Sequence, residues 1–366
     1  MTAIFNASLR RTLFLGFAAV FTSGVLARCA NAQTGGYRQT NLASNVLHAA
    51  AHTQRSLNAP WGIAISPGTG FVIASHGSGT FANYDASGDL VSLPARVAGP
   101  PQLDANPGPS AVAANPTGTF VAPGSELPSP VLMATVDGII SGQYADHNGD
   151  ILVSSLLAVD NSAEGAVYTG LAILTPNCCA PFLAAANFGE NFIDTYTGLF
   201  EPLGIPGAFV DKHLPAGYAP FNIQVIGGQV FVAYALQNAA RNAPVAGPGN
   251  GIIDIYKLDG SFVRRFISHG HLNAPWGIAK AGAEFGAFSN DILVANFGDG
   301  TINAFNPISG AFVGRLKTAS GSPIVNPGLR GIEFGGEGVG DPNTLYFTAG
   351  AAGNPGLFGA ITETTR

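Results

Sequence analysis

The octapeptide Leu-Asn-Ala-Pro-Trp-Gly-Ile-Ala occupies residues 57–64 and recurs unchanged at residues 272–279. The two copies contain both tryptophans of the chain, Trp61 and Trp276. Exact repetition over this length indicates that one structural unit was duplicated. The rest of the chain should therefore contain further, degraded copies of that unit.

Two short apolar runs mark each of six copies. The second run of each copy closes at intervals of roughly 50 to 60 residues. The closing residues are Tyr84, Tyr144, Tyr196, Tyr256, Phe305 and Ile361. The first runs span residues 71–75, 131–136, 182–187, 230–234, 292–296 and 345–348. Runs of this length that are apolar on both faces are typical of strands buried between neighbouring sheets.

Repeats of this length, rich in short strands and glycine turns, predict an all-β fold, a six-bladed β-propeller with four-stranded antiparallel blades. The octapeptide region begins strand A, the two apolar runs are strands B and C, and segments such as 261–267 form strand D. The last copy lacks a fourth strand, so we predict that the N-terminal segment 37–46 completes that blade. This closure would remove exposed sheet edges. We expect one propeller domain over residues 33–366.

The composition fits this fold and excludes some partners. The chain has 49 glycines and 25 prolines in 366 residues, which suits many strands joined by tight turns. Charged residues make up only 10% and the net charge is −6, so no basic stripe is available for a phosphate backbone. We therefore expect no nucleic-acid partner. Beyond the N-terminal region, no apolar stretch is long enough for a membrane span.

The first 32 residues have a different character. Arg10 and Arg11 precede an apolar stretch over residues 13–26, and Ala30-Asn31-Ala32 follows. This order predicts a secretory signal peptide, 1–32, that is cleaved after Ala32, so the mature protein should be secreted or periplasmic. The paired arginines leave the twin-arginine export route open beside ordinary secretion.

Cleavage would leave two cysteines, Cys178 and Cys179, which are adjacent in a proline-flanked segment. In an oxidising compartment they can form a strained vicinal disulfide, or they can simply occupy a loop as free thiols. No C-x-x-C motif accompanies them. Both states remain open from the sequence.

Several phrases carry a family resemblance. They are found at residues 58–64, 137–142, 160–162, 218–223, 247–251 and 296–305, and matching phrases extend from Tyr37 to Thr362. In these phrases the chain resembles an uncharacterised family of secreted bacterial six-bladed β-propellers that is similar to NHL-repeat and TolB-like propellers. The resemblance implies the fold and leaves the activity open, because related propellers include binding modules, lactonases and other metal-dependent hydrolases.

The geometry of a propeller indicates where a ligand site should lie. Loops that join strand D to the next strand A, and strand B to strand C, emerge on one face around the central channel, and ligand sites favour such mouths. Polar residues in those loops are the predicted ligand-binding residues of this top face. They are Asn58, His76, Asp137, Asn187, Tyr218, Asn222, Asn250, His271, Asn273, Asn296 and Asp299. Asparagine and aspartate beside glycine are also ordinary turn formers, which is the competing interpretation for each of them.

Three functions are compatible with this site. The first is a binding or scaffold module whose top-face loops hold a small molecule, a glycan or a protein. The second is a hydrolase of lactone or ester type, in which calcium is held by a ring of side-chain oxygens and a carboxylate such as Asp137 or Asp299 transfers the proton. The third is a purely structural role in surface assembly. The sequence identifies no catalytic residue and no certain cofactor.

Three other features have both a functional and a structural interpretation. Asp146-His147-Asn148-Gly149-Asp150 resembles the start of a calcium loop, but Ile151 stands where that loop needs glycine, so a solvated turn is favoured. His269 and His271 would face the same way on a strand and could ligate a metal, although solvent-facing histidines are the default. The two tryptophans could stack on a sugar, but packing between blades is the favoured interpretation.

Overall fold

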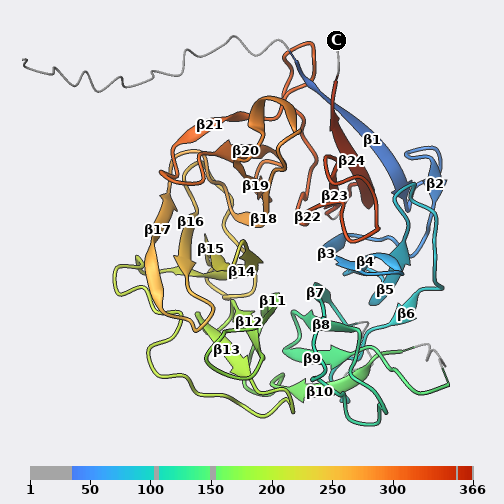
Figure 1. Ribbon diagram of the computed structural model, residues 1–366, viewed down its shortest axis with the longest axis vertical. Coiled ribbons are helices and arrows are strands. Elements are labelled where there is room, and N and C mark those ends of the chain that lie inside the picture. Colours follow the sequence, from blue (N-terminus) through green and yellow to red (C-terminus); the bar gives the residue numbers. More distant parts are fainter. Residues whose placement is uncertain (1–34, 103–106, 149–153, 352, 365–366) are drawn as a thin grey trace, which may run out of the picture. The chain divides into compact units, whose positions relative to one another are not determined.

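The computed structural model describes residues 35–102, 107–148, 154–351 and 353–364. The predicted signal peptide, 1–32, lies outside the described residues. The described chain is all-β, and the helix found in it is one 3-10 turn, η1 (Gly286–Phe288). Its strands form six sheets that surround a common axis, as Figure 1 shows. The predicted six-bladed β-propeller is confirmed.

Four blades have the expected four strands in the order A to D from the axis outward. Blade 1 consists of β3 (Pro60–Ser66), β4 (Gly70–Ser75), β5 (Thr80–Tyr84) and β6 (Ala95–Arg96). Blade 2 consists of β7 (Pro109–Ala114), β8 (Val131–Thr135), β9 (Ile139–Gly142) and β10 (Leu156–Asp160). Blade 4 consists of β14 (Tyr218–Ile226), β15 (Gln229–Leu236), β16 (Ile252–Tyr256) and β17 (Phe262–Ser268). Blade 5 consists of β18 (Pro275–Lys280), β19 (Ile292–Asn296), β20 (Ile302–Phe305) and β21 (Phe312–Arg315).

The other two blades depart from the simple pattern. Blade 3 consists of β11 (Tyr168–Leu174), β12 (Phe182–Asn187) and β13 (Phe192–Tyr196), and its fourth position is a single bridge between Tyr196 and Pro202. A ladder is short there because proline cannot donate a backbone hydrogen bond. Blade 6 consists of β22 (Ile332–Phe334), β23 (Leu345–Ala349), β24 (Leu357–Glu363) and β1 (Tyr37–Ser44), with the short β2 (His52–Thr53) added parallel to β1.

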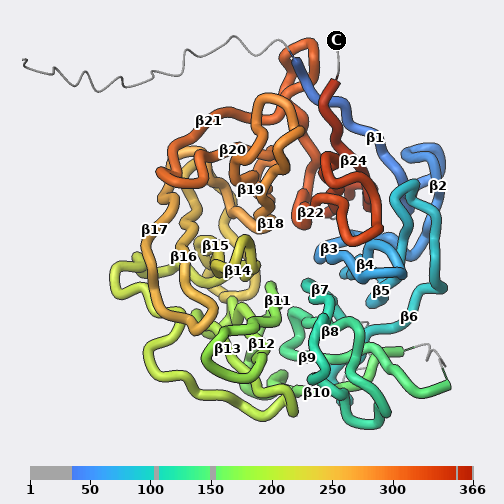
Figure 2. The backbone as a smooth tube through the Cα atoms, in the orientation of Figure 1, coloured from blue at the N-terminus to red at the C-terminus, as the bar shows by residue number. Residues whose placement is uncertain are grey.

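The N-terminal strand closes the ring as predicted. Strand β1 pairs antiparallel with β24 from Tyr37 opposite Glu363 to Ser44 opposite Leu357. The backbone tube in Figure 2 shows the blue N-terminal strand beside the red C-terminal strand. The two ends of the propeller are therefore held in one sheet, and the inner strand β22 contacts both β18 and β3.

The core lies in the layers between blades. In β4, Phe71 and Ile73 pack in a cluster shared with blade 6, whereas Val72 and Ala74 pack in a cluster shared with blade 2. Side chains alternate across a strand, so a strand between two neighbours is apolar at every position. This burial on both faces explains why the sequence shows continuous apolar runs and no polar alternation.

Candidate functional site

A β-bulge near the start of the inner strand turns one residue of each blade toward the axis. In β7, for example, Pro109 pairs with Thr135 and Ala111 with Ala134, which leaves Ser110 as the extra residue. The same irregularity occurs in the inner strands of blades 1, 3, 4 and 5. In blade 6, Arg330 takes the equivalent position, directly before Gly331. We call these six residues the axial layer; they are Trp61, Ser110, Thr169, Phe221, Trp276 and Arg330.

The axial layer corrects the favoured interpretation of the two tryptophans. Trp61 and Trp276 do not pack between neighbouring blades; their ring centroids lie 6.5 Å apart, and both belong to a cluster on the axis with Phe221. The bulge is the reason, because it aims the repeated side chain inward. The two rings are only 6% and 5% exposed, which argues against an open stacking platform for a sugar.

A second layer covers the first on the face of the D-to-A and B-to-C loops, which we call the DA face. It is formed by the residue at the end of strand B in each blade. In five blades the backbone N–H of this residue donates to the segment that precedes the inner strand, and in blade 4 the residue pairs with the inner strand itself. They are His76, Val136, Phe188, Ala235, Phe297 and Gly350. His76 is the titratable member of this layer, and burial and the charge of Arg330 lower its pKa.

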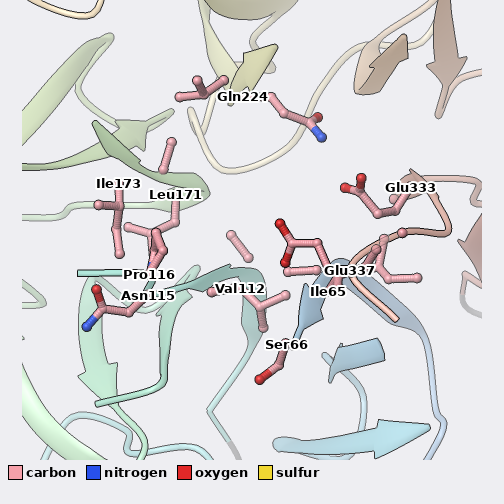
Figure 3. A pocket seen from close by; sticks show the side chains of 18 of the residues that line it. Ile65, Ser66, Val112, Asn115, Pro116, Leu171, Ile173, Gln224, Glu333 and Glu337 are labelled. Carbon is pink, nitrogen blue, oxygen red and sulfur yellow. The ribbon is translucent and has the colours of Figure 1, made fainter. Parts of the chain in front are cut away.

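On the other side of the axial layer the channel opens into a cavity of about 720 Å³. Its wall is made by the later residues of the inner strands β3, β7, β11, β14 and β22, and Trp276 also lines it. Figure 3 shows Glu333, Glu337 and Gln224 directed into this space, with Ile65, Val112 and Ile173 around them. The cavity therefore lies toward the face of the A-to-B loops, which we call the AB face. Its volume is in the range that holds a small ligand.

Two carboxylates and an amide are among the polar groups of this cavity, which Ser66, Asn115 and Asn222 also line. Burial, reinforced by the nearby charge of Glu337, raises the pKa of Glu333 to about 7. Gln224 accepts a hydrogen bond from the backbone N–H of Ile278 through Oε1. Its Nε2 group has no partner among the residues that the structure describes. The cavity thus offers an acidic pair and a free amide donor on an apolar wall.

The raised pKa of Glu333 predicts a pH-dependent stability. Between its ordinary value and about 7 the folded protein holds a proton that the unfolded chain releases, so stability falls as pH rises through this window. Glu333→Gln removes this loss. We expect urea unfolding to show that the free energy of unfolding of the variant rises relative to that of wild type by on the order of 2 kcal/mol as the pH goes from 4.5 to 8. The exposed residue Glu201 provides the control. If the free energy of unfolding of Glu333→Gln changes with pH in the same way as that of Glu201→Gln, the prediction is contradicted.

Most of the predicted site residues lie around the DA face, whereas Asn222 lies within β14 and lines the cavity on the AB side. His76 and Asp137 are neighbours across Gly108, whose N–H donates to Asp137 Oδ2 at 2.6 Å. The asparagines of blades 3 to 5 bind mainly backbone groups, some in their own blade and some in the neighbouring blade. Asn187 accepts from Val167 N–H, Asn222 donates to Trp276 O, Asn250 donates to Val245 O, Asn273 accepts from Gly247 N–H, and Asn296 donates to His271 O.

The remaining predicted residues are more exposed or pack on aromatic rings. Asp299 is exposed and accepts hydrogen bonds from the backbone and hydroxyl of Thr301, which is a turn-forming arrangement. His271 stacks on Phe312 at 3.6 Å, and Tyr218 lies beside His269. Asn58 is exposed and accepts from Gly77 N–H through its backbone. These contacts fit the turn-forming interpretation, and a ligand-binding role for the predicted residues stays a prediction.

Sequence reasoning missed the polar residues of the axis itself, namely Arg330, Glu333, Glu337 and Gln224. A signal for Arg330 was present. Residues 329–332 read Leu-Arg-Gly-Ile, a degraded copy of the Pro-Trp-Gly-Ile in the octapeptide, so an arginine replaces the repeated tryptophan. The glutamates had no comparable signal, because their position on the channel depends on how the inner strands converge.

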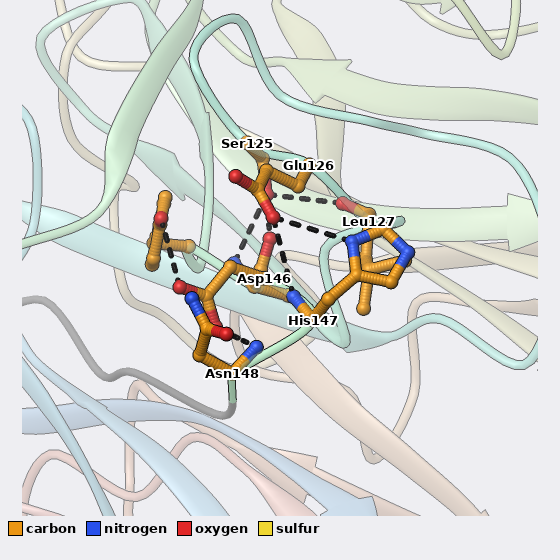
Figure 4. Close-up of polar contacts among 8 residues, drawn as sticks. Ser125, Glu126, Leu127, Asp146, His147 and Asn148 are labelled. Carbon is orange, nitrogen blue, oxygen red and sulfur yellow. Dashed lines mark hydrogen bonds and ion pairs between the residues drawn. The ribbon is translucent and has the colours of Figure 1, made fainter.

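The calcium-loop candidate forms local contacts, some of which are drawn in Figure 4. Asp146 accepts hydrogen bonds from the backbone N–H of Asn148 and from the hydroxyl of Tyr144. His147 Nδ1 lies 3.2 Å from Glu126 Oε2. These contacts agree with the solvated-turn interpretation. Gly149 and Asp150 lie outside the described residues.

Other candidate ligands are also placed. Cys178 and Cys179 are free and exposed in this structure. His269 and His271 lie after the end of β17 and not on a strand, and His269 Nδ1 lies 2.9 Å from Gly249 O. The described part of the chain contains no group of three or more histidine, cysteine, aspartate or glutamate side chains that could hold a metal ion. Within the same residues, no helix has the length and apolar character of a membrane span.

Comparisons with known proteins place the chain among viral relatives. Uncharacterized protein R648 of Acanthamoeba polyphaga mimivirus is 36% identical over 330 residues, which cover 87% of this chain and 78% of the viral protein. Uncharacterized protein L690 of the same virus is 34% identical over 83% of this chain and 79% of its own length. The chain belongs to the family of these mimivirus proteins. The resemblance to a bacterial family is therefore supported for the propeller fold and not for a bacterial source.

Solved structures resemble this member of the R648 family in fold alone. A streptogramin B lyase has a TM-score of 0.54 with 11% sequence identity, covering 92% of this chain and 100% of the lyase. The PQQ-bound aldose sugar dehydrogenase of Streptomyces coelicolor has a TM-score of 0.52 with 13% identity, covering 91% of this chain and 99% of that protein. No family model matches the sequence.

Proposed function

We propose that the protein is a binding propeller that takes a small molecule into the cavity on its axis. The observation that carries this proposal is the cavity of about 720 Å³, which residues from the inner strands of all six blades line together. Ligand sites are concave, mostly apolar and equipped with a few convergent polar groups. The axial cavity meets that description, with Glu333, Glu337 and Gln224 among its polar groups.

The lining indicates the class of ligand. Carboxylates accept hydrogen bonds and attract cations, and the raised pKa of Glu333 lets this side chain serve as donor or acceptor near neutral pH. Ile65, Val112 and Ile173 would cover an apolar body. The cavity therefore suits a small molecule with an apolar part and amine or hydroxyl groups. The top-face loops remain the predicted place for a larger partner, either a glycan or a protein.

A blocked cavity tests the proposal. Ala114 lines the cavity at the end of β7 and is only partly buried, so Ala114→Trp should fill the space without disturbing the blade core. We expect amines or polyols that raise the melting temperature of the wild-type protein in a thermal-shift screen to lose that effect in the variant. The matched control is Val313→Trp on the outer strand β21, where Val313 is 47% exposed.

Two results would count against a cavity ligand. One is a screen in which no amine or polyol stabilises the wild-type protein. The other is a stabilising compound whose effect is the same in Ala114→Trp and Val313→Trp. Either result would leave the top-face loops as the better candidate for binding.

The calcium-dependent hydrolase stays a separate prediction. Its proposed carboxylates, Asp137 and Asp299, are both engaged by backbone N–H groups and lie in different blades. A chromogenic lactone or ester, turned over by the purified protein and silenced by chelation, would favour it. Turnover that survives thorough chelation would exclude the calcium version.

A further inference from the structure

Three nitrogen atoms without a hydrogen-bond partner meet at one place on the axis. Among the described residues, the buried side-chain atoms that lack a partner include Trp61 Nε1, His76 Nδ1 and Arg330 Nε. The Arg330 guanidinium carbon lies 3.7 Å from the centre of the Trp61 ring, and the ring centroids of Trp61 and His76 lie 5.2 Å apart. Buried polar atoms are normally paired, so a group of unpaired ones calls for an explanation.

The two copies of the octapeptide show that this lack of partners is local. Trp276 Nε1 donates to the backbone oxygen of Thr169 at 2.9 Å. Trp61 occupies the same position in its own copy, yet its Nε1 has no such acceptor. The difference lies in the surroundings, because Trp61 faces Arg330 and His76. Neither neighbour is placed to accept its proton, since no hydrogen bond joins them in the structure.

Arg330 is the unusual member of the axial layer. The equivalent residues in the other blades are aromatic or carry a hydroxyl group, and the guanidinium is held between the rings of Trp61 and Phe297, at 3.7 and 4.2 Å. No carboxylate among the described residues forms an ion pair with it. Burial lowers the pKa of Arg330 to about 9. A cation in such a place lacks the compensation that buried charges usually have.

Within the described chain, the groups around Arg330 carry nitrogen atoms or aromatic rings, and none of them is a carboxylate. Trp61 and His76 present nitrogen donors or a titratable nitrogen, and Phe297 presents the face of a ring. Asp137, a carboxylate whose charge acts on His76, accepts a hydrogen bond from the backbone N–H of Gly108. As whole residues Arg330 and His76 are half-buried, although their unpaired nitrogen atoms are themselves buried. Arg330 does not line the cavity proposed above, which lies on the other side of the axial layer.

We propose that Arg330, Trp61 and His76 form a binding site for the oxyanion of a small ligand, a carboxylate or a phosphate group, at the DA end of the axis. The guanidinium fork pairs with either anion through parallel N–H donors. The indole N–H and the imidazole supply further donors, and the oxyanion satisfies the nitrogen atoms that the protein leaves unpaired. The site is distinct from the axial cavity and goes beyond the proposed function.

The two tryptophans of the chain report on this site, because both belong to the axial layer. We expect their fluorescence to change saturably when inorganic phosphate or acetate is added at constant ionic strength, while chloride alone has no such effect. The two probes distinguish a phosphate site from a carboxylate site. Calorimetry with the same salts gives an independent dissociation constant.

Substitutions separate specific binding from a general salt effect. Arg330→Met should weaken anion binding about tenfold or more, since it removes a charged hydrogen-bond donor. Arg330→Lys keeps the positive charge but lacks the paired N–H donors of the guanidinium group. This variant should bind the anion more weakly than wild type. The matched control is Arg264→Met, because Arg264 also lies over a ring, that of Phe266, but donates to the backbone oxygen of Ile308 at 2.8 Å. This control should bind as wild type does.

The proposal is overturned if neither phosphate nor acetate changes the wild-type signal beyond chloride. It is also overturned if Arg330→Met, shown to be folded by its circular dichroism spectrum, binds as tightly as Arg264→Met. If Arg330→Met does not fold, Arg330→Lys decides the matter, and unchanged affinity in that variant counts against the site.

Discussion

Gly277→Val is expected to destabilise the propeller by about 3 kcal/mol or more, or to prevent folding. A Cβ at Gly277 would meet the backbone oxygen of Arg330 and the backbone of Ile332 in the next inner strand. Backbone atoms cannot move aside as a flexible side chain can. The inner strands converge on the axis, so neighbouring blades approach most closely there.

The other octapeptide glycine gives the same test in a second place. A Cβ at Gly62 would lie 2.8 Å from Val112 N and 2.9 Å from Ala111 Cα of the neighbouring inner strand. We expect Gly62→Val to lose stability in the same way. The control is Gly204→Ala, since a Cβ at Gly204 meets nothing within 4 Å. Urea unfolding of the three variants measures the effect, and a Gly277→Val protein as stable as Gly204→Ala would refute the role of close approach.

Tyr37→Ala is expected to lower the free energy of unfolding by about 3 to 5 kcal/mol, because this side chain anchors the strand that closes the ring. Tyr37 is 3% exposed and packs on Phe285 and Phe288 at centroid distances of 4.9 and 5.7 Å. Its hydroxyl donates to Phe285 O at 2.9 Å and accepts from Phe288 N–H at 3.3 Å. The substitution leaves a cavity and two unpaired backbone groups.

Neighbouring substitutions separate these contributions. Tyr37→Phe keeps the ring and should cost about 1 kcal/mol through the lost hydrogen bonds. Arg38→Ala, at the next and exposed position of β1, should have almost no effect. The comparison requires urea unfolding of the three proteins side by side. If Tyr37→Ala and Arg38→Ala unfold at the same urea concentration, the ring does not depend on this contact for closure.

Local pattern was enough to predict the blades. The apolar run 182–187 coincides with β12 (Phe182–Asn187), and the run 292–296 coincides with β19 (Ile292–Asn296). A strand buried on both faces is apolar throughout, so burial is encoded in the strand's own residues. Ring closure by β1 was predictable for a similar reason, because the last copy lacked a strand that the N-terminal segment could supply.

The candidate site was predicted only in part. The sequence indicated the loops of the DA face and included His76, but it did not indicate that Arg330 lies over Trp61 or that both tryptophans meet on the axis. Arg330 and Trp61 are brought together by closure of the ring between blades 6 and 1. Contacts of this kind depend on the number of blades and on the bulge, and no local pattern encodes them.

The sequence by itself determined the strands, their six repeats and the strand that closes the ring, because periodicity and burial act within each copy. Only the tertiary structure decided which side chains point along the axis and how much space they leave. The bulge at Trp61, Trp276 and their equivalents turns one residue per blade inward, and six blades then set the width of the channel. The unpaired guanidinium of Arg330 and the acidic cavity that contains Glu333 both follow from this convergence.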